Sequence, residues 1–295
     1  MFNSSKTMDN QNLKAFLTVA ECGSFSSAAE RLHLTQSAVS KRIALLEMQV
    51  GKNLFDRIAR QVSLTEAGQA LLPRARHILQ ESEAAIQAIH DLSGEVRGRL
   101  RLAISHHLGL HRLPPVLKQF ANQHPNVNLD IAFMDSEKAY EQVLQGHSEV
   151  AVITLALETH QNIHSKKIWR DPLQFICAID HQLAQIDQPS LHDLAKHPVI
   201  LPGLNTYTGR IIQSLFDRQN ILLSAPLSTN YLETIGTMVE IGLGWSVLPD
   251  TLVNNLYVMP VVHSPIEREL GYIHHKKRSL SNVAMAFIKL LDQIS

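Results

Sequence analysis

The sequence predicts an α+β multidomain chain: a small helical domain at the N-terminus, a long helix, and a two-lobed α/β domain in the C-terminal part. Three observations lead to this prediction. Apolar residues recur at helical spacing through the first 50 positions, a heptad-spaced stretch follows Thr65, and β-rich runs alternate with helical runs from Arg99 onward. At 295 residues the chain has room for two or three domains.

The first two helices are short. One is predicted over residues 9–22, because its apolar residues form a single helical stripe. That stripe consists of Leu13, Phe16, Leu17 and Ala20. Gly23 ends this helix, and the serines that follow it can cap a second helix running to Leu32. Ala28 and Ala29 on the second helix leave room for a close neighbour, and together with Leu32 they are its predicted inward residues.

The third helix follows after a turn at His33 and Leu34. Thr35 can cap it, and Gly51 ends it. Its predicted inward residues are Val39, Ile43 and Leu46. Its outward side is polar and basic, and this succession of helices is the helix-turn-helix pattern. An ordinary three-helix bundle is the alternative, because exposed helix faces also carry Lys, Gln and Ser.

A basic hairpin is predicted after the third helix. Its strands fall near residues 54–57 and 61–64, with a turn at residues 58–60, which gives the helix-turn-helix a wing. Between Arg31 and Arg76 the sequence has eight basic and three acidic residues, although the whole chain has 27 of each sign. Such a local excess is the electrostatic signature of phosphate binding, and an ordinary solvated face is the alternative.

A long helix is predicted from Thr65 to about Leu92. Its apolar and small residues alternate at spacings of four and three, which is a heptad seam. The seam residues are Leu71, Ala75, Ile78, Ser82, Ala85, Ile89 and Leu92. A partner helix would bury this seam, whereas packing on the chain's own domain is the alternative. Pro73 removes one backbone hydrogen bond, so a bend is expected near Leu72.

The rest of the chain reads as an α/β domain with a mainly parallel sheet. Two series of strands and helices occur, and the last strand and helix return to the first series. The domain would thus have two lobes, joined by crossing strands near residues 163–169 and 261–270. Ligands of such sheets bind at strand carboxyl ends and in the cleft between lobes.

Essentially the whole chain resembles the LysR-type transcriptional regulators, closely in the first 70 residues and more loosely in the C-terminal half. The stretch "FLTVAECGSFSSAAERLHLTQSAVSKRIALLEMQVGKNLFDR", followed by "LTEAG", is similar to that family's winged helix-turn-helix signature almost position for position. The segments "LPPVLKQFANQHPNVNLDI", "LQGHSEVAVI" and "MVEIGLGWSVLP" look like its effector-binding domain. One departure is the lead of about seven residues before Met8, where the family pattern begins.

The resemblance implies a bacterial DNA-binding regulator whose effector-binding domain is similar to periplasmic binding proteins. Members are generally tetramers, often a dimer of dimers, that bend promoter DNA and alter the bend when a small molecule binds. The implied partners are double-stranded promoter DNA, a small organic effector that can be anionic, further copies of the chain, and RNA polymerase. The expected ranges are 8–66 for the winged domain (helix-turn-helix 25–44), 67–93 for the dimerising linker helix, 94–98 for a hinge, and 99–295 for the effector-binding domain, with lobe 1 at 99–163 and 269–295 and lobe 2 at 168–262.

The third helix is expected to enter the major groove. Gln36 can pair with an adenine edge and Arg42 with guanine or phosphate, while Ser37 and Ser40 permit close approach. The basic residues assigned to phosphates are Lys41, Arg57 and Arg60. The complete predicted set is Ser26, Thr35, Gln36, Ser37, Ser40, Lys41, Arg42, Arg57 and Arg60.

An effector site is predicted at the turn "SHHLGLHRLP". Ser105 lies where a strand ends and a helix begins, so backbone N–H groups there could hold a carboxylate, and His106 or His107 could add a donor. Adjacent histidines are more often surface or capping residues, which is the alternative. Matching to the family pocket adds the candidates Thr154, Thr206, Tyr207 and Asn230. No metal ion and no cofactor besides the effector are expected, because a metal needs more convergent ligands.

Other classes of protein fit less well. The motifs G-x-S-x-G, G-x-G-x-x-G, H-E-x-x-H and the Walker loop do not occur, so no catalytic residue is predicted and an enzyme is not expected. The two lobes alone would suit a solute-binding protein of a transporter, although the first 90 residues and the lack of a signal peptide argue against it. A nonspecific DNA-binding protein is a further alternative, which the balanced charge disfavours.

The expected compartment is the cytoplasm. The start "MFNSSKTMDN" lacks the basic and apolar blocks of a secretory signal, and no run of 18 apolar residues could span a membrane. Cys22 and Cys177 are expected to be reduced thiols, since cytosolic thiols are kept reduced. A redox switch made by this pair is the alternative.

Overall fold

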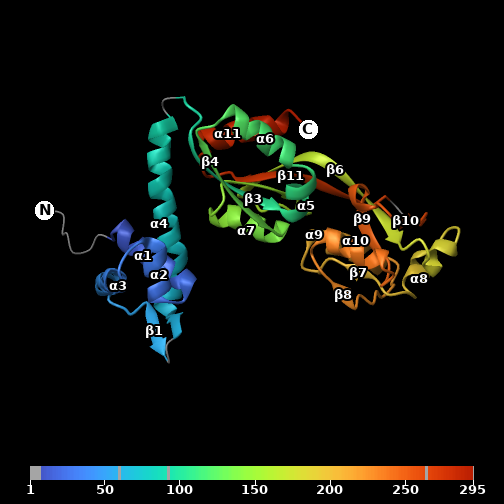
Figure 1. Ribbon diagram of the computed structural model, residues 1–295, viewed down its shortest axis with the longest axis horizontal. Coiled ribbons are helices and arrows are strands. Elements are labelled where there is room, and N and C mark those ends of the chain that lie inside the picture. Colours follow the sequence, from blue (N-terminus) through green and yellow to red (C-terminus); the bar gives the residue numbers. More distant parts are fainter. Residues whose placement is uncertain (1–7, 59–60, 92–93, 263–264, 295) are drawn as a thin grey trace. The chain divides into compact units, whose positions relative to one another are not determined.

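The computed structural model describes residues 8–58, 61–91, 94–262 and 265–294, whose elements are labelled in Figure 1. The chain divides into two compact units, residues 1–90 and residues 91–295. Each unit has its own hydrophobic core, so each is described by itself. The division falls at the end of the long helix, next to the predicted hinge.

Three short helices begin the first unit, as predicted. They are α1 (Asn10–Cys22), α2 (Phe25–Leu32) and α3 (Gln36–Val50). A side-chain oxygen caps each of them by accepting a hydrogen bond from a first-turn N–H. The caps are Asp9, Ser24 and Thr35. Gly23 and Gly51 end α1 and α3 in the left-handed conformation, which glycine adopts without strain.

The predicted inward residues make much of the first core. Val39, Ile43 and Leu46 of α3 are buried, and so are the two alanines of α2. The stripe predicted for α1 faces this core, with Leu17 and Ala20 half-buried against it, but it is incomplete because Ala15 and Val19 are also buried. The reason is that α1 contacts both α2 and α3, so its buried face is wider than one stripe.

A hairpin packs on this core through aromatic rings. Its strands are β1 (Phe55–Ile58) and β2 (Gln61–Leu64), antiparallel with Phe55 opposite Leu64. The ring of Phe55 lies 5.4 Å from that of Phe16 and 5.8 Å from that of Phe25. Glu47 of α3 also accepts a hydrogen bond from the Leu54 N–H at 2.7 Å. The predicted wing is therefore present, and residues 59–60 of its turn lie outside the described residues.

The predicted long helix is α4 (Glu66–Asp91). The Thr65 hydroxyl caps it by accepting a hydrogen bond from the Gly68 N–H at 3.0 Å. The helix continues through Pro73, and the bend near Leu72 stays a prediction. Although α4 has 26 residues, neither it nor any other described helix is apolar enough to cross a bilayer.

The first lobe of the second unit alternates strands and helices as predicted (Figure 1). Its elements are β3 (Gly98–Ser105), α5 (His106–His111), α6 (Pro114–Gln123), β4 (Val127–Met134), α7 (Ser136–Gln145), β5 (Val150–Thr154), β11 (Glu267–His275) and α11 (Asn282–Asp292). The last two elements come from the end of the chain and close the core, where the rings of Phe120 and Phe287 pack edge to face at 5.2 Å.

The second lobe is built around Trp245. Its elements are β6 (Ile163–Cys177), η1 (Gln182–Gln185), α8 (Leu191–Leu194), β7 (Ile200–Leu201), α9 (Tyr207–Asp217), β8 (Leu227–Ser228), α10 (Leu232–Glu240), β9 (Ser246–Pro249), η2 (Asp250–Leu252) and β10 (Tyr257–Val258). The indole of Trp245 lies between the rings of Phe175 and Phe216, and its N–H donates to the Leu194 carbonyl at 2.8 Å. A buried indole is thus both packed and hydrogen-bonded.

One mixed sheet joins the two lobes, so the predicted mainly parallel sheet is wrong. The order is β10-β6-β11-β5-β3-β4, and β9 also pairs with β6. Among its described strands, β3 pairs in parallel with β4 and β5, while the other pairs are antiparallel. The reason lies in the crossings: the chain leaves the first lobe along β6 and returns along β11 beside it, in the opposite direction. The predicted crossing strands coincide with β6 and with the first residues of β11.

Candidate functional site

The outer face of α3 is polar and accessible. Gln36, Ser37 and Lys41 are exposed, and Ser40 and Arg42 are half-buried. The inward residues of the same helix hold it against α1 and α2, so this face points away from the core of its unit. Thr35 contributes through its cap, since its hydroxyl accepts from the Ala38 N–H at 3.2 Å. The predicted residue Ser26 is exposed on α2.

Arg42 is held in place by a residue that the sequence analysis did not identify. Its Nη1 donates to Gln11 Oε1 of α1 at 3.1 Å. A guanidinium has five N–H donors, so this contact orients Arg42 and leaves donors for another acceptor. The side chains of Arg57 and Arg60, also predicted to bind phosphates, lie outside the described residues.

The apolar seam of α4 is divided between two environments. Ala75 is buried in the first core and Leu71 packs on it, which confirms the alternative prediction for this part of the helix. Further along, Ile78, Ile86 and Ile89 are 39%, 58% and 69% exposed. Isoleucine is usually buried, so this end of α4 presents an apolar surface. Ser82 of the seam accepts a hydrogen bond from Asn10, and Leu92 lies outside the described residues.

A pocket of about 450 Å³, open mouth included, lies between the lobes of the second unit. The seven residues predicted for an effector site all line it. They are Ser105, His106, His107, Thr154, Thr206, Tyr207 and Asn230. The structure therefore brings together residues up to 125 positions apart in sequence, and their role in binding stays a prediction.

Several other lining residues were not predicted from the sequence. They are Asp135, Ser136, Glu137, Pro202, Thr208, Leu232 and Arg268. Asp135, Ser136 and Glu137 directly follow β4, and a polar cluster at the carboxyl end of a strand was the available signal. Arg268 gave no comparable signal, because its place in the pocket depends on how β11 pairs with β6.

Hydrogen bonds fix the pocket walls. Asn230 Nδ2 donates to Asp135 Oδ2 at 3.0 Å, and its Oδ1 accepts from the Gly203 N–H at 3.1 Å. The first contact joins the two lobes. The Thr206 hydroxyl donates to the Gly203 carbonyl at 2.7 Å and caps α9. Both of these hydrogen bonds stabilise the wall of the pocket. Ser105 precedes α5 without making a side-chain cap, which leaves its hydroxyl for a ligand.

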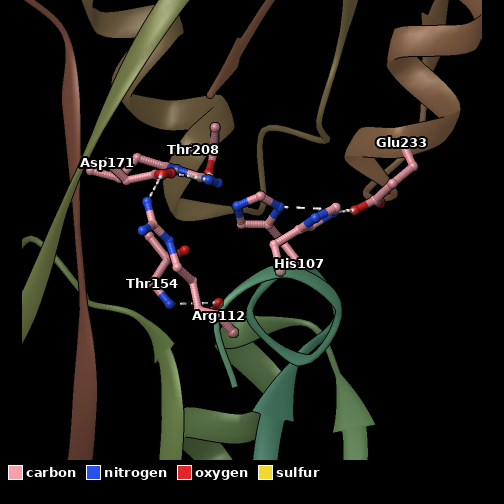
Figure 2. Close-up of polar contacts among 9 residues, drawn as sticks. His107, Arg112, Thr154, Asp171, Thr208 and Glu233 are labelled. Carbon is pink, nitrogen blue, oxygen red and sulfur yellow. Dashed lines mark hydrogen bonds and ion pairs between the residues drawn. The ribbon is translucent and has the colours of Figure 1, made fainter. Parts of the chain in front are cut away.

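The lining residue Arg268 forms a buried ion pair with Asp171, which Figure 2 labels beside Thr208. Arg268 and Asp171 are opposite each other on β11 and β6, and their side chains are 3% and 1% exposed. Arg268 Nε donates to Asp171 Oδ2 at 2.9 Å, and Nη1 donates to the Thr208 hydroxyl at 3.0 Å. Arg112 approaches the other carboxylate oxygen at 3.7 Å. A buried guanidinium in this setting is rigid and fully charged.

Burial shifts the pKa of two further lining residues. It raises the pKa of Tyr207 to about 12, with the nearby Glu137 carboxyl acting in the same direction. Burial also raises the pKa of Glu137, although the Tyr207 N–H, which donates to its Oε1, opposes the shift. Tyr207 therefore remains a neutral phenol that can donate a hydrogen bond at neutral pH.

Three side chains meet at one edge of the pocket. His107 and His111 lie one turn apart on α5, and Glu233 lies on α10. Glu233 Oε1 is 2.9 Å from His111 Nε2 and 3.8 Å from His107 Nδ1. Figure 2 shows His107 directed toward Glu233. The imidazoles of His107 and His111 help to lower the pKa of Glu233 to about 2, whereas burial lowers the pKa of His107.

Comparisons with known families match nearly the whole described chain. Residues 93–294 match the LysR substrate binding domain, and residues 10–69 match the bacterial regulatory helix-turn-helix proteins of the lysR family. The uncharacterized HTH-type transcriptional regulator YbhD of Escherichia coli (strain K12) is 31% identical over 288 residues, covering 95% of this chain and 90% of that protein. A regulator from the ibpB-leuC intergenic region of Azotobacter vinelandii is 64% identical over 108 residues, covering 37% of this chain and 75% of that protein.

Solved structures share the fold at lower identity. Full-length CbnR complexed with its target DNA aligns with a TM-score of 0.71 at 21% identity, covering 98% of this chain and all of that one. The effector-binding domain of QuiR in complex with shikimate aligns with a TM-score of 0.60 at 19% identity, covering 66% of this chain and 95% of that one.

A winged helix-turn-helix unit followed by a two-lobed domain with a pocket defines a ligand-responsive transcription regulator. The chain belongs to the LysR family of transcriptional regulators, with a DNA-binding helix-turn-helix domain and an effector-binding domain.

Proposed function

We propose that this chain binds a specific promoter sequence as a homodimer or homotetramer and changes the bend of that DNA when a small organic effector enters the pocket. The observation that carries the proposal is the division of α3 into a buried apolar face and an accessible polar and basic face. Family membership favours this reading of α3 over an ordinary three-helix bundle.

Base reading is assigned to the first turns of α3. An α-helix fits the major groove, and an amide such as that of Gln36 can pair with adenine. Arg42 would contact guanine or phosphate from the position that Gln11 fixes. Lys41 is exposed and carries a mobile charge, which suits a phosphate contact that sets affinity but carries no sequence information.

Two matched substitutions test this assignment by DNA titration. Gln36→Ala is expected to weaken binding to a specific site by about 1–3 kcal/mol and to change binding to unrelated DNA little. Lys41→Ala is expected to weaken both complexes and to reduce the salt slope by about 1. The DNA upstream of the chain's own gene is the first specific fragment to use. If Gln36→Ala weakens binding to both DNAs equally, Gln36 contacts the DNA backbone and not a base edge.

The exposed end of α4 is the proposed dimer contact. Ile78, Ile86 and Ile89 would be covered by the same residues of a second copy, as in other isologous helix pairs. Two recognition helices must then reach successive major-groove faces about 34 Å apart. Full-length CbnR, which shares the fold, is described in complex with its target DNA.

The pocket is the proposed effector site, and its occupant a small organic molecule that can carry an acid group. Support comes from its donors: the uncommitted Ser105 hydroxyl, the neutral Tyr207 phenol and the fixed Arg268 guanidinium. QuiR's effector-binding domain, which shares this fold, is described with shikimate.

Thermal-shift screening of the full chain against small organic acids, followed by calorimetry on the hits, tests the effector site. Ser105→Ala is expected to weaken a confirmed ligand by about tenfold, which corresponds to one lost hydrogen bond of about 1.4 kcal/mol. Ser214→Ala is the control, since its hydroxyl bonds within α9 and does not line the pocket. Unchanged affinity in Ser105→Ala counts against the site.

We further propose that the chain acts in the cytoplasm without catalysing a reaction, and that its DNA-bound form contacts RNA polymerase. Support comes from the family, whose members are transcription regulators. Mass spectrometry of a confirmed effector after prolonged incubation with the chain would reveal a product if the chain were an enzyme. Cell fractionation and a pull-down of polymerase on promoter DNA test the other two statements.

A further inference from the structure

We propose that His107, His111 and Glu233 bind a divalent transition-metal ion, with Zn²⁺ as the reference ion. This site goes beyond the proposed function, because DNA binding and an organic effector do not require a metal. No metal was expected from the sequence, because the adjacent histidines His106 and His107 have no convergent third ligand nearby in the sequence. The structure supplies that ligand as Glu233, 126 positions further along the chain than His107.

The distances suit one small ion. The candidate ligand atoms of the three residues all lie within 4.8 Å of one another. Two of the separations are 2.9 Å, from His111 Nε2 to Glu233 Oε1, and 3.8 Å, from His107 Nδ1 to the same oxygen. Ligands about 2.1 Å from a tetrahedral Zn²⁺ are about 3.4 Å apart, midway between these values. A small rotation of side chains would therefore complete the site.

The buried imidazole of His107, whose contact with Glu233 is an ion-pair distance of 3.8 Å and not a hydrogen bond, is the independent observation that points to a ligand. Its side chain is 8% exposed, and within the described residues neither ring nitrogen has a hydrogen-bond partner. Buried polar groups without partners are rare because each costs free energy. The contact between His111 and Glu233 gives those two side chains a hydrogen-bond partner, but both ring nitrogens of His107 remain without a hydrogen bond. A metal ion accounts for all three, because it gives the buried nitrogen a ligand bond.

Both lobes hold the three ligands on rigid elements. On α5, residues four apart share one face, so His107 and His111 project together, and Leu108 anchors the helix in the core of the first lobe. On α10, the neighbouring Leu232 is buried in the second lobe and fixes the position of Glu233. A metal bound here would tie one lobe to the other across the pocket edge.

The ligand set selects the class of metal. Two imidazoles and one carboxylate suit Zn²⁺, Co²⁺ and Ni²⁺, whereas Mg²⁺ and Ca²⁺ prefer sets made of oxygen. Three protein ligands also leave a coordination position open. Because His107 lines the pocket, a pocket ligand with an oxygen donor could occupy that position.

The surrounding charges permit a cation. Arg268 and Arg112 approach this region, but both contact Asp171, which offsets part of their charge. The carboxylate of Glu233 supplies the negative charge that a metal requires.

Titration of the full-length protein with Co²⁺, after treatment with a chelator, tests the proposal. We expect one equivalent per chain, with the visible absorption of low-coordinate Co²⁺, and displacement of that spectrum by Zn²⁺. His111→Ala and Glu233→Gln are each expected to weaken binding by about 100-fold or more, because even losing a ligand's outer hydrogen-bond partner costs about 10- to 100-fold. Zn²⁺ should also raise the unfolding temperature of the unmodified chain and not of His111→Ala.

Two histidine controls separate this site from adventitious binding. His192→Ala removes an exposed histidine of α8, and His164→Ala removes one ring of the pair that His164 forms with His274 at 4.7 Å. Both variants should keep the full affinity. Absence of stoichiometric Co²⁺ binding overturns the proposal, and so does full affinity in His111→Ala when circular dichroism shows that variant to be folded. Neither result bears on DNA binding, which is measured separately by titration with DNA.

Discussion

Arg268 and Asp171 show at the residue scale how a charged group is kept inside the second unit. Both side chains are almost fully buried, and their partners satisfy most of the donors and acceptors. Removing one member of such a pair is costly because the other charge stays buried without a partner. We therefore expect Arg268→Met to destabilise this unit by about 3–5 kcal/mol in urea denaturation.

Replacing both members at once should recover most of that loss, since Arg268→Met with Asp171→Leu leaves no buried charge. The matched control is Arg99→Met. Its pair with Asp130 has a similar contact of 2.7 Å, but the side chains are 56% and 42% exposed. Arg99→Met should lower the free energy of unfolding by about 0–1 kcal/mol. If Arg268→Met lowers the free energy of unfolding as little as Arg99→Met does, the buried ion pair does not stabilise this unit as proposed.

Cys177 is a buried thiol at the end of β6, and burial raises its pKa to about 11 because the thiolate is poorly solvated there. The thiolate is the reactive form, so Cys177 should resist iodoacetamide at pH 8 in the folded chain, while the half-buried Cys22 is alkylated. Peptide mass spectrometry measures both. Alkylation of Cys177 as fast as of Cys22 would contradict this prediction and revive the redox-switch alternative.

At the element scale, α4 combines two kinds of contact in one helix. Its first turns complete the core of the first unit, and its later isoleucines are exposed. Heptad spacing alone could not distinguish these roles, because a seam that packs on its own domain and a seam that pairs with a second copy have the same period. The exposure of Ile89 compared with Ala75 separates them.

Substitution of Ile89 tests the dimer contact. Ile89→Lys puts a charge into the proposed interface and should shift the chain toward monomer in sedimentation experiments. Gln87→Lys is the control, because a residue two positions earlier lies on the opposite side of the helix. If Ile89→Lys sediments as the unmodified protein does, the assembly uses another surface.

The pocket also belongs to this scale, because its residues come from the ends of several elements. The seven residues chosen by family matching and from the strand-to-helix turn all line one pocket, and their role in binding stays a prediction. Glu233 and Arg268 could not be placed, since one depends on how α10 faces α5 and the other on the register of β11 against β6. The placement of such residues depends on contacts between segments that are far apart in the sequence, so the local sequence pattern does not predict it.

For the whole molecule, the order of domains was predictable because hydrophobic period and capping residues are local signals. Thr35, Gly51 and Thr65 mark boundaries that the structure confirms. The sheet was less predictable, since strand direction depends on where the chain returns. β11 lies beside β6 with Leu270 opposite Trp169, and this pairing makes the sheet mixed.

The central claim for the whole molecule is sequence-specific binding to duplex DNA through α3. DNase footprinting of the intact chain on the DNA upstream of its own gene tests it most directly. We expect a protected site that persists in excess competitor DNA and is lost at the same protein concentration in Gln36→Ala. No protected site at any salt concentration or effector condition, or a footprint unchanged in variants of the α3 outer face, would contradict it.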